Sequence, residues 1–180
     1  RTYLSSGMLK EARGEAERLV SYLHPYASAG VRIVGLEPSC VLTVRDEVRR
    51  LVPSEEAELV ADSLLLFEEA VDADIAGGAP VPFVELPRRA AVHCHCHQKA
   101  AGAAEATLSV LRRVPGLEVE AIESGCCGMA GAFGYHAEHY DVSLQMGELD
   151  LLPAVRRRGD DTLIVAPGTS CRAQILDATG

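Results

Sequence analysis

Residues 89–100 read RAAVHCHCHQKA, and this stretch decides the fold that we expect for the chain. Its apolar beginning, residues 89–93, indicates a short buried strand, and a helical pattern follows from about residue 100 to 113. The same order of strand, turn and helix recurs along the chain. The other expected strands are residues 31–36, 117–122 and 162–166. Strands that alternate with helices pair in parallel through right-handed crossovers. The sequence therefore predicts an α/β fold of parallel sheets with flanking helices.

The expected helices lie between these strands. Residues 6–29 carry apolar side chains at helical spacing, which is typical of an amphipathic helix. Ser54, followed by two glutamates, offers an N-cap for a helix that extends to about residue 73. Further helices are expected at about residues 40–51 and 138–157, and a short one after Cys171.

Two segments of the chain resemble each other. Residues 33–40 and 164–171 each contain an apolar strand, a turn with Pro or Gly, and a Ser-Cys pair that begins a helix. We interpret the two halves as pseudo-repeated units, of which the first is truncated at its N-terminus. The expected divisions are 1–76 for the C-terminal part of the first unit, 77–87 for a linker rich in Gly and Pro, and 88–180 for a complete second unit.

Composition and charge argue against several classes of function. The 180 residues have a formal net charge of −9, whereas sequence-independent nucleic-acid binding needs a basic face. No apolar run has the length of a transmembrane helix, and no Walker or dinucleotide-binding glycine motif is present. We therefore expect no nucleic-acid partner, no transmembrane segment and no nucleotide site within these residues.

Four of the six cysteines follow expected strands. These are Cys96, Cys126, Cys127 and Cys171. The carboxyl ends of parallel strands meet at one edge of a sheet, so we expect these thiols to converge there. Thiolates are soft ligands that suit zinc or iron–sulfur clusters. Buried structural thiols are the alternative reading, because cysteine is also a common small core residue.

The adjacent pair Cys126 and Cys127 favours a cluster over a single ion. Neighbouring side chains on a regular backbone point in different directions, and several iron atoms offer several attachment points. Gly125 and Gly128 flank the pair, and we expect both to supply the backbone freedom that convergence requires.

Cys94 and His95 are further candidate ligands within the opening stretch. On an extended segment, residues two apart share a face, so His93, His95 and His97 are expected opposite Cys94 and Cys96. The histidines and thiols together would suit zinc. The alternative is that one histidine only orients the site through a hydrogen bond to a ligand sulfur, and that Cys94 is a spare thiol.

The segment from Cys96 through Gly125-Cys126-Cys127-Gly128 to Ser170-Cys171 resembles the cysteine-rich CCG domain. This domain is found in heterodisulfide reductases and in the iron–sulfur subunits of glycolate oxidase and anaerobic glycerol-3-phosphate dehydrogenase. The amino-acid sequences of residues 92–100, 126–131 and 133–135 resemble a narrower branch of this domain. That branch is the C-terminal iron–sulfur region of fused FAD-linked oxidases of D-2-hydroxy acids. Many relatives end with Cys-x-x-Cys, but Cys171 is followed by Arg172-Ala173-Gln174.

The resemblance implies two tandem CCG-type units, each with a four-iron cluster. Cys96, Cys126, Cys127 and Cys171 would bind the cluster of the second unit, and Cys40 would be a remaining ligand of a truncated first site. The expected function is electron transfer from a flavin, held in another domain, to a downstream acceptor. Alternatives are a zinc-binding structural or docking module and a cluster-based thiol/disulfide reductase. A cytoplasmic location is expected, with contact to the inner face of the membrane through partners.

Overall fold

The computed structural model describes residues 2–180. The chain divides into two compact units between Ala70 and Val71. No helix in the described residues combines the length and the apolar character needed to cross a membrane.

The first unit is mainly helical and contains a two-stranded parallel sheet. Its elements, in chain order, are α1 (Thr2–Ser5), α2 (Leu9–Ser28), β1 (Ile33–Gly35), α3 (Pro38–Thr43), the π-helical turn η1 (Val44–Val48), α4 (Arg49–Leu51), α5 (Glu55–Ser63) and β2 (Leu64–Leu66). The long helix α2 packs against α5, and it buries Ala12, Ala16 and Val20 on one face at helical spacing. Ser54 caps α5 as expected, since its hydroxyl accepts a hydrogen bond from the backbone of Ala57 at 3.2 Å.

Strand β2 corrects the sequence prediction of one helix to about residue 73. Leu64, Leu65 and Leu66 pair in parallel with Ile33, Val34 and Gly35 instead. The helix ends at Ser63, and α6 (Phe67–Ala76) begins directly after the strand. Leucine has a good intrinsic helix propensity, but burial of Leu64 and Leu66 in the paired strand overrides this local preference.

The second unit is built around a three-stranded parallel sheet with β3 at its centre. Its remaining elements are β3 (Arg89–Val92), α7 (Cys96–Ala100), α8 (Ala104–Arg112), β4 (Glu118–Ala121), the 3₁₀ turns η2 (Phe133–Tyr135) and η3 (Ala137–His139), α9 (Tyr140–Leu149), α10 (Leu151–Arg156), β5 (Thr162–Val165) and α11 (Thr169–Thr179). The strand order is β4-β3-β5, and all pairs are parallel. The expected α/β class is therefore confirmed.

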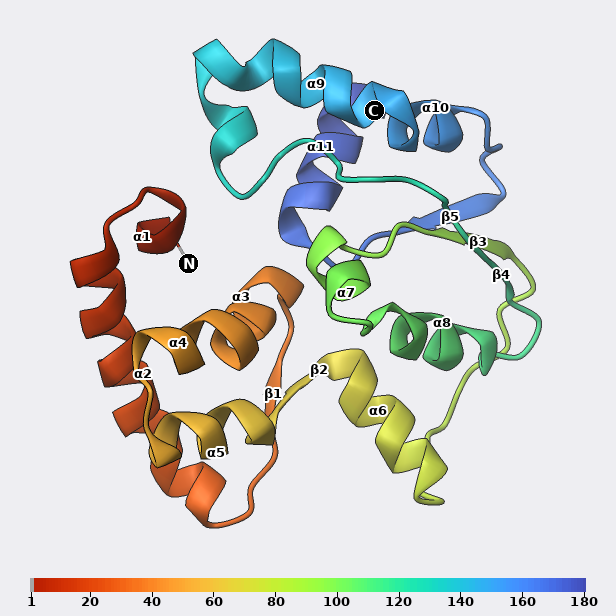
Figure 1. The fold of residues 1–180 in the computed structure, drawn as a ribbon. Coiled ribbons are helices and arrows are strands. Elements are labelled where there is room, and N and C mark those ends of the chain that lie inside the picture. The colour runs from red at the N-terminus through yellow and green to blue at the C-terminus, as the bar shows by residue number, and fades with distance from the viewer. Residues whose placement is uncertain (1) are drawn as a thin grey trace. The chain divides into compact units, whose positions relative to one another are not determined.

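Helices cover both faces of this sheet (Figure 1). Ala91 of β3 packs with α10 and α11 in a core that includes Leu152 and Ile175. Val92, the next residue, points to the opposite face and packs with Leu108 of α8. Successive side chains of a strand alternate between faces, so β3 alone contributes to both layers.

Two expected helix boundaries in this unit were wrong. A short helix, α7, begins at Cys96, whereas the sequence predicted extended backbone over residues 93–97 and a helix only from about residue 100. The expected helix 138–157 is divided into α9 and α10 at Asp150, whose backbone leaves the helical region (φ −141°, ψ −52°). Residues 77–87, the expected linker, contain neither helix nor strand.

The two Ser-Cys segments have the same place in their helices. Cys40 is the third residue of α3, which follows β1, and Cys171 is the third residue of α11, which follows β5. This correspondence is compatible with pseudo-repeated units.

Leu152 and Leu149 allow a matched test of the second core. We expect Leu152→Ala to lower the free energy of unfolding by about 2–5 kcal/mol, because Leu152 is 0% exposed and its removal leaves a cavity. Leu149→Ala removes the same atoms from a side chain that is 77% exposed, and we expect a change of no more than about 0.5 kcal/mol. Urea denaturation followed by circular dichroism measures both, and equal losses would contradict this description of the core.

Candidate metal centre

Four thiols from three separate segments come together at the carboxyl edge of the second sheet. Cys96 begins α7, Cys126 and Cys127 lie in the loop after β4, and Cys171 lies in the first turn of α11. The sulfur of Cys126 accepts hydrogen bonds from the thiols of Cys96 and Cys127, and Cys127 also donates to Cys171. Cys127 and Cys171 are buried, and Cys96 and Cys126 are half-buried. None of the six cysteines, all within residues 2–180, forms a disulfide.

The contacts divide the four sulfurs into two proton donors and two acceptors. Hydrogen bonds from Cys127 and Cys96 lower the pKa of Cys126, and the hydrogen bond from Cys127, followed by the influence of His93, lowers the pKa of Cys171 to about 5. The pKa of Cys96 is raised by its bond with Cys126 and by burial, and that of Cys127 by its bonds with Cys126 and Cys171 and by burial. The thiolate form is therefore favoured at Cys126 and Cys171, and the thiol form at Cys96 and Cys127.

The loop after Cys127 directs backbone N–H groups at the sulfurs. The N–H of Gly128 donates to the Cys126 sulfur at 3.4 Å, and the backbone of Ala130 also lowers the pKa of Cys126. Gly128 and Ala130 both have positive φ angles, 98° and 43°. Successive N–H groups in such a turn form a concave site for negative charge.

Gly128 is the flanking glycine that the structure requires. A Cβ at this position would lie 2.0 Å from the carbonyl oxygen of Ser143. Gly125, by contrast, has no positive φ, and a Cβ added there would meet no atom within 4 Å. The expectation that both glycines are needed for convergence is therefore wrong for Gly125.

Helix α7 turns Cys96 into the site and places Cys94 outside it. Cys94 follows the alternation of β3, packs with Val92 and Leu108, and directs its thiol to the carbonyl of Ala104 at 3.9 Å. The prediction that Cys94 and Cys96 share a face was wrong, because the strand alternation ends where the helix begins at Cys96. Cys94 is thus not brought to the other four thiols.

His95 is buried beside the thiols and caps α7. Its Nδ1 accepts the backbone N–H of His97 at 3.1 Å, while Gln98 accepts the backbone N–H of His95 at 3.0 Å. A Cβ on Gly168 would lie 2.3 Å from the His95 ring and 3.3 Å from the Cys171 sulfur, so these groups enclose one small space. Because Nδ1 is used as an acceptor, only Nε2 of His95 is available to a ligand.

His93, which the sequence analysis placed on a face opposite Cys94 and Cys96, lies on the side of the sheet where Cys171 is. It is 0% exposed, and its influence lowers the pKa of the Cys171 thiol. Ala91 faces α10 and α11, and the two-residue period of the strand carries His93 to that same face. The strand alternation that starts at Ala91 is the signal that could have found it.

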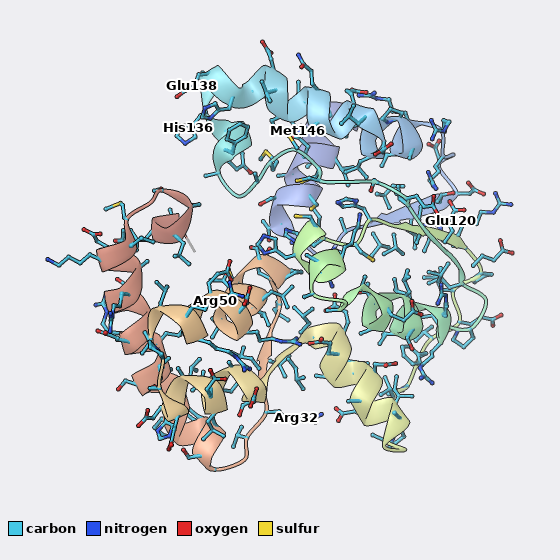
Figure 2. All side chains as sticks on the ribbon, viewed as in Figure 1. Arg32, Arg50, Glu120, His136, Glu138 and Met146 are labelled. Carbon is cyan, nitrogen blue, oxygen red and sulfur yellow. The ribbon has the colours of Figure 1, made fainter. Side chains whose placement is uncertain are left out.

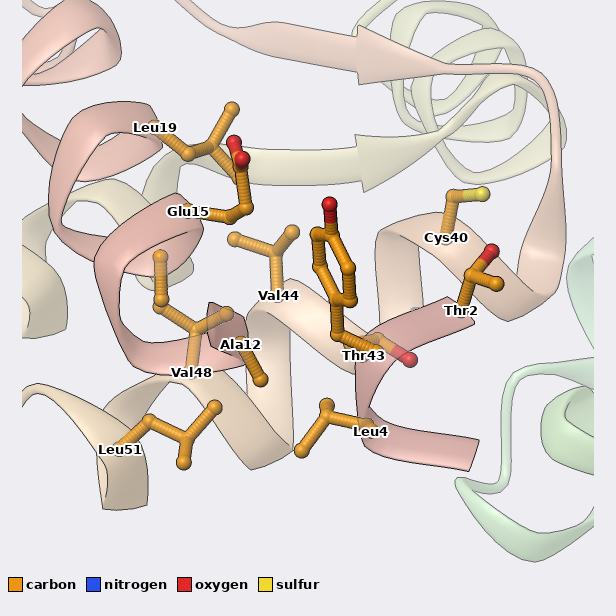
Figure 3. A pocket seen from close by; sticks show the side chains of 12 residues that line it. Thr2, Leu4, Ala12, Glu15, Leu19, Cys40, Thr43, Val44, Val48 and Leu51 are labelled. Carbon is orange, nitrogen blue, oxygen red and sulfur yellow. The ribbon is translucent and has the colours of Figure 1, made fainter. Parts of the chain in front are cut away.

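Cys40 lies in the first unit, on the wall of a largely apolar cavity of about 360 Å³. Val44, Val48 and Leu51 contribute to this wall (Figure 3). The Cys40 residue is exposed and forms no disulfide.

The second-unit site fits a group that binds several thiolates at separate points. Its donors are soft sulfurs, its walls are buried, and N–H groups converge on it. Within residues 2–180, no three or more His, Cys, Asp or Glu side chains are arranged around a position for one metal ion. Instead, the sulfurs form a chain of pairwise contacts: Cys96 contacts Cys126, Cys126 contacts Cys127, and Cys127 contacts Cys171.

Comparison with known families agrees with this geometry. The model of the cysteine-rich CCG domain matches residues 90–176, which include all four clustered thiols. Residues 90–176 belong to the CCG family. The matched segment begins in β3 and ends in α11, so this CCG domain contains the whole three-stranded sheet.

Curated relatives align with nearly the whole chain. A subunit of the anaerobic glycerol-3-phosphate dehydrogenase of Escherichia coli K12 is 28% identical over 177 residues, 98% of this chain and 44% of that protein. D-2-hydroxyglutarate dehydrogenase is 30% identical in E. coli K12 (97% of this chain, 17% of that protein) and 29% identical in Pseudomonas putida (96% and 16%). The chain thus spans less than half the length of these relatives. No solved structure matches the chain.

The two flanking glycines provide a test of the CCG loop. We expect Gly128→Ala to lower the free energy of unfolding by about 2 kcal/mol or more, because the new methyl group meets a backbone oxygen and the left-handed φ is strained. Gly125→Ala is the control, with an expected change within about 0.5 kcal/mol. Thermal or urea unfolding gives both values; a tolerated Gly128→Ala would show that the loop differs from this description.

Proposed function

We propose that this chain is an iron–sulfur electron-transfer domain of an FAD-linked oxidoreductase. In this proposal, Cys96, Cys126, Cys127 and Cys171 hold a four-iron cluster. The observation that carries it is the contact among four thiols from three segments that are far apart in sequence. A bound cluster would accept and release single electrons, and its potential would depend on burial and on hydrogen bonds to its sulfurs.

The chain's own groups prepare the site for negative charge. The N–H of Gly128 and the backbone of Ala130 stabilise the thiolate of Cys126. Burial of Cys127 and Cys171 keeps water away from that side of the site. Cys96 and Cys127, whose pKa values are raised, must each lose a proton before they bind iron. Loading is therefore expected to weaken as the pH falls.

The flavin and the organic substrate would be held outside this chain. Its relatives are named as dehydrogenases of D-2-hydroxyglutarate and of glycerol-3-phosphate. Both compounds are alcohols. We propose a D-2-hydroxy acid as the substrate class, a flavin-containing domain of the same or a partner chain as the electron donor, and a downstream carrier as the acceptor. Free thiol ligands favour a reducing cytoplasm, and contact with the inner face of the membrane would come through partners.

For the first unit, we propose that residues 1–76 are the C-terminal part of a preceding CCG-type unit, joined through residues 77–87 to the complete unit 88–180. Cys40 would be a ligand of that first site. The equal position of Cys40 and Cys171 in α3 and α11 supports this.

Metal and sulfide analysis tests the proposed cluster directly. After anaerobic reconstitution with iron and sulfide, we expect about four irons and four acid-labile sulfides per complete site, and a paramagnetic signal at low temperature after reduction. A single zinc without sulfide, in protein handled without air and supplied with iron, would favour the zinc-binding module. A colourless protein without iron would contradict the proposal.

Substitution of single cysteines tests the ligand set. We expect Cys126→Ser and Cys127→Ser each to lose most of the reconstituted iron, because a serine hydroxyl is a poor ligand for a cluster. Cys94→Ser is the matched control and should retain iron, since Cys94 packs against α8. Iron content per folded chain measures the effect, and equal loss in all three variants would make Cys94 a ligand.

A further inference from the structure

One ring nitrogen of His93 has a hydrogen-bond partner, and the other has none of ordinary geometry within residues 2–180. Its Nδ1 lies 2.9 Å from the hydroxyl oxygen of Ser124. Its Nε2 is buried and makes no hydrogen bond of ordinary geometry to any group in residues 2–180. A buried donor or acceptor without a partner destabilises the fold, so we expect this nitrogen to have a role in the site.

The unoccupied nitrogen belongs to a ring that interacts with Cys171. His93 and Cys171 come from the end of β3 and the start of α11, and strands β3 and β5 are paired up to the backbone bond from His93 N to Val165 O at 2.8 Å. Ala91, two residues before His93 on the same face of β3, packs in the buried cluster that contains Cys171. The His93 ring therefore lies on the side of the sheet where the Cys171 sulfur is, and the two side chains interact.

The Ser124 hydroxyl decides which nitrogen of His93 carries the proton. It can donate either to Nδ1 of His93 at 2.9 Å or to the carbonyl of Ile122 at 3.5 Å. The 2.9 Å contact forms either by the hydroxyl donating to Nδ1 or by Nδ1–H donating to the hydroxyl. We assign the first direction, because the buried Nε2 on the Cys171 side of the sheet then carries the proton that a sulfur can accept. In the neutral imidazole the proton is then on Nε2, and this nitrogen becomes a donor.

Lys99 holds Ser124 in this position. Its ammonium group donates to the carbonyl oxygen of Ser124 and, at 3.3 Å, to that of Gly125. Helix α7, which presents Cys96, is thereby connected to the loop that presents Cys126 and Cys127.

We propose that His93 is a positioning residue of the centre, which donates a hydrogen bond from Nε2 to the sulfur of Cys171 and is held in the required tautomer by Ser124. Because Cys171 is a ligand only under the proposed function, this role depends on that function. A donor to a ligand sulfur stabilises the reduced cluster, which carries the additional negative charge, and so raises the reduction potential.

The test compares the reconstituted full chain with four variants at one fixed pH. His93→Leu removes the donor, His93→Gln returns an N–H near the position of Nε2, and Ser124→Ala removes the group that selects the tautomer. His136→Leu is the control, because this histidine is exposed near the start of α9 (Figure 2). Iron and sulfide content and the midpoint potential, followed by low-temperature paramagnetic resonance, are measured for each.

We expect His93→Leu to retain iron and sulfide but to shift the reduction equilibrium at least tenfold toward the oxidised form, about 59 mV for one electron. Ser124→Ala should shift it in the same direction by less, His93→Gln should recover most of the change, and His136→Leu should match the original chain. If His93→Leu does not fold, the midpoint potentials of Ser124→Ala and His93→Gln still test whether His93 donates to the Cys171 sulfur.

Three results would overturn the inference. An unchanged potential in His93→Leu, or in Ser124→Ala when His93→Leu cannot be measured, would mean that the donor is absent. Loss of iron in His93→Leu, without recovery in His93→Gln, would make His93 a ligand or a purely structural residue. If the original chain takes up no iron and sulfide, the proposed function itself fails, and the role of His93 fails with it.

Discussion

Parallel pairing of β3 with both of its neighbours is the constraint on which the second unit depends. The ladder continues to the ends of the strands, where Ile122 N bonds Val92 O and His93 N bonds Val165 O, each at 2.8 Å. Three chain segments therefore leave the sheet at one edge and in one direction. Each segment then turns into a loop or helix that carries cysteine. Without this pairing, thiols at positions 96, 126 and 171 would have no reason to meet.

Once the thiols meet, electrostatics governs the site. Four uncompensated thiolates in a buried space would repel one another strongly, and the free thiols avoid this by sharing protons between neighbouring sulfurs. The N–H groups of the loop at Gly128 supply further compensation. A cationic inorganic core would replace both the shared protons and part of this compensation. Under the proposed function, the arrangement that stabilises the free thiols would also accommodate a cluster.

Polar side chains behind the thiols connect the three segments. Gln98 is fully buried, and it joins α7 to α8 by a 3.1 Å bond to Thr107 while it caps the start of α7. Gln174 of α11 donates to the backbone and hydroxyl of Ser143 in α9. These bonds are buried, so each would leave an unsatisfied group if its partner moved. Such a network restricts the positions of the helices that present Cys96 and Cys171.

The amino-acid sequence alone determined the α/β class, the parallel strands and the four cysteines that come together, because strand and helix periodicities are local and thiols have a specific chemistry. Tertiary structure decided the rest. Leu64–Leu66 became a strand because β1 offered a partner. Helix α7 began at Cys96 because His95 and Gln98 form its cap, and Thr107 of α8 holds Gln98 in place. This early helix start separates Cys94 from Cys96, and the sheet alternation before it directs His93 to the thiols. The pairing of β2 with β1 and the packing of β3 on α10 and α11 join residues that are distant in sequence, so local patterns do not contain the energies of these contacts.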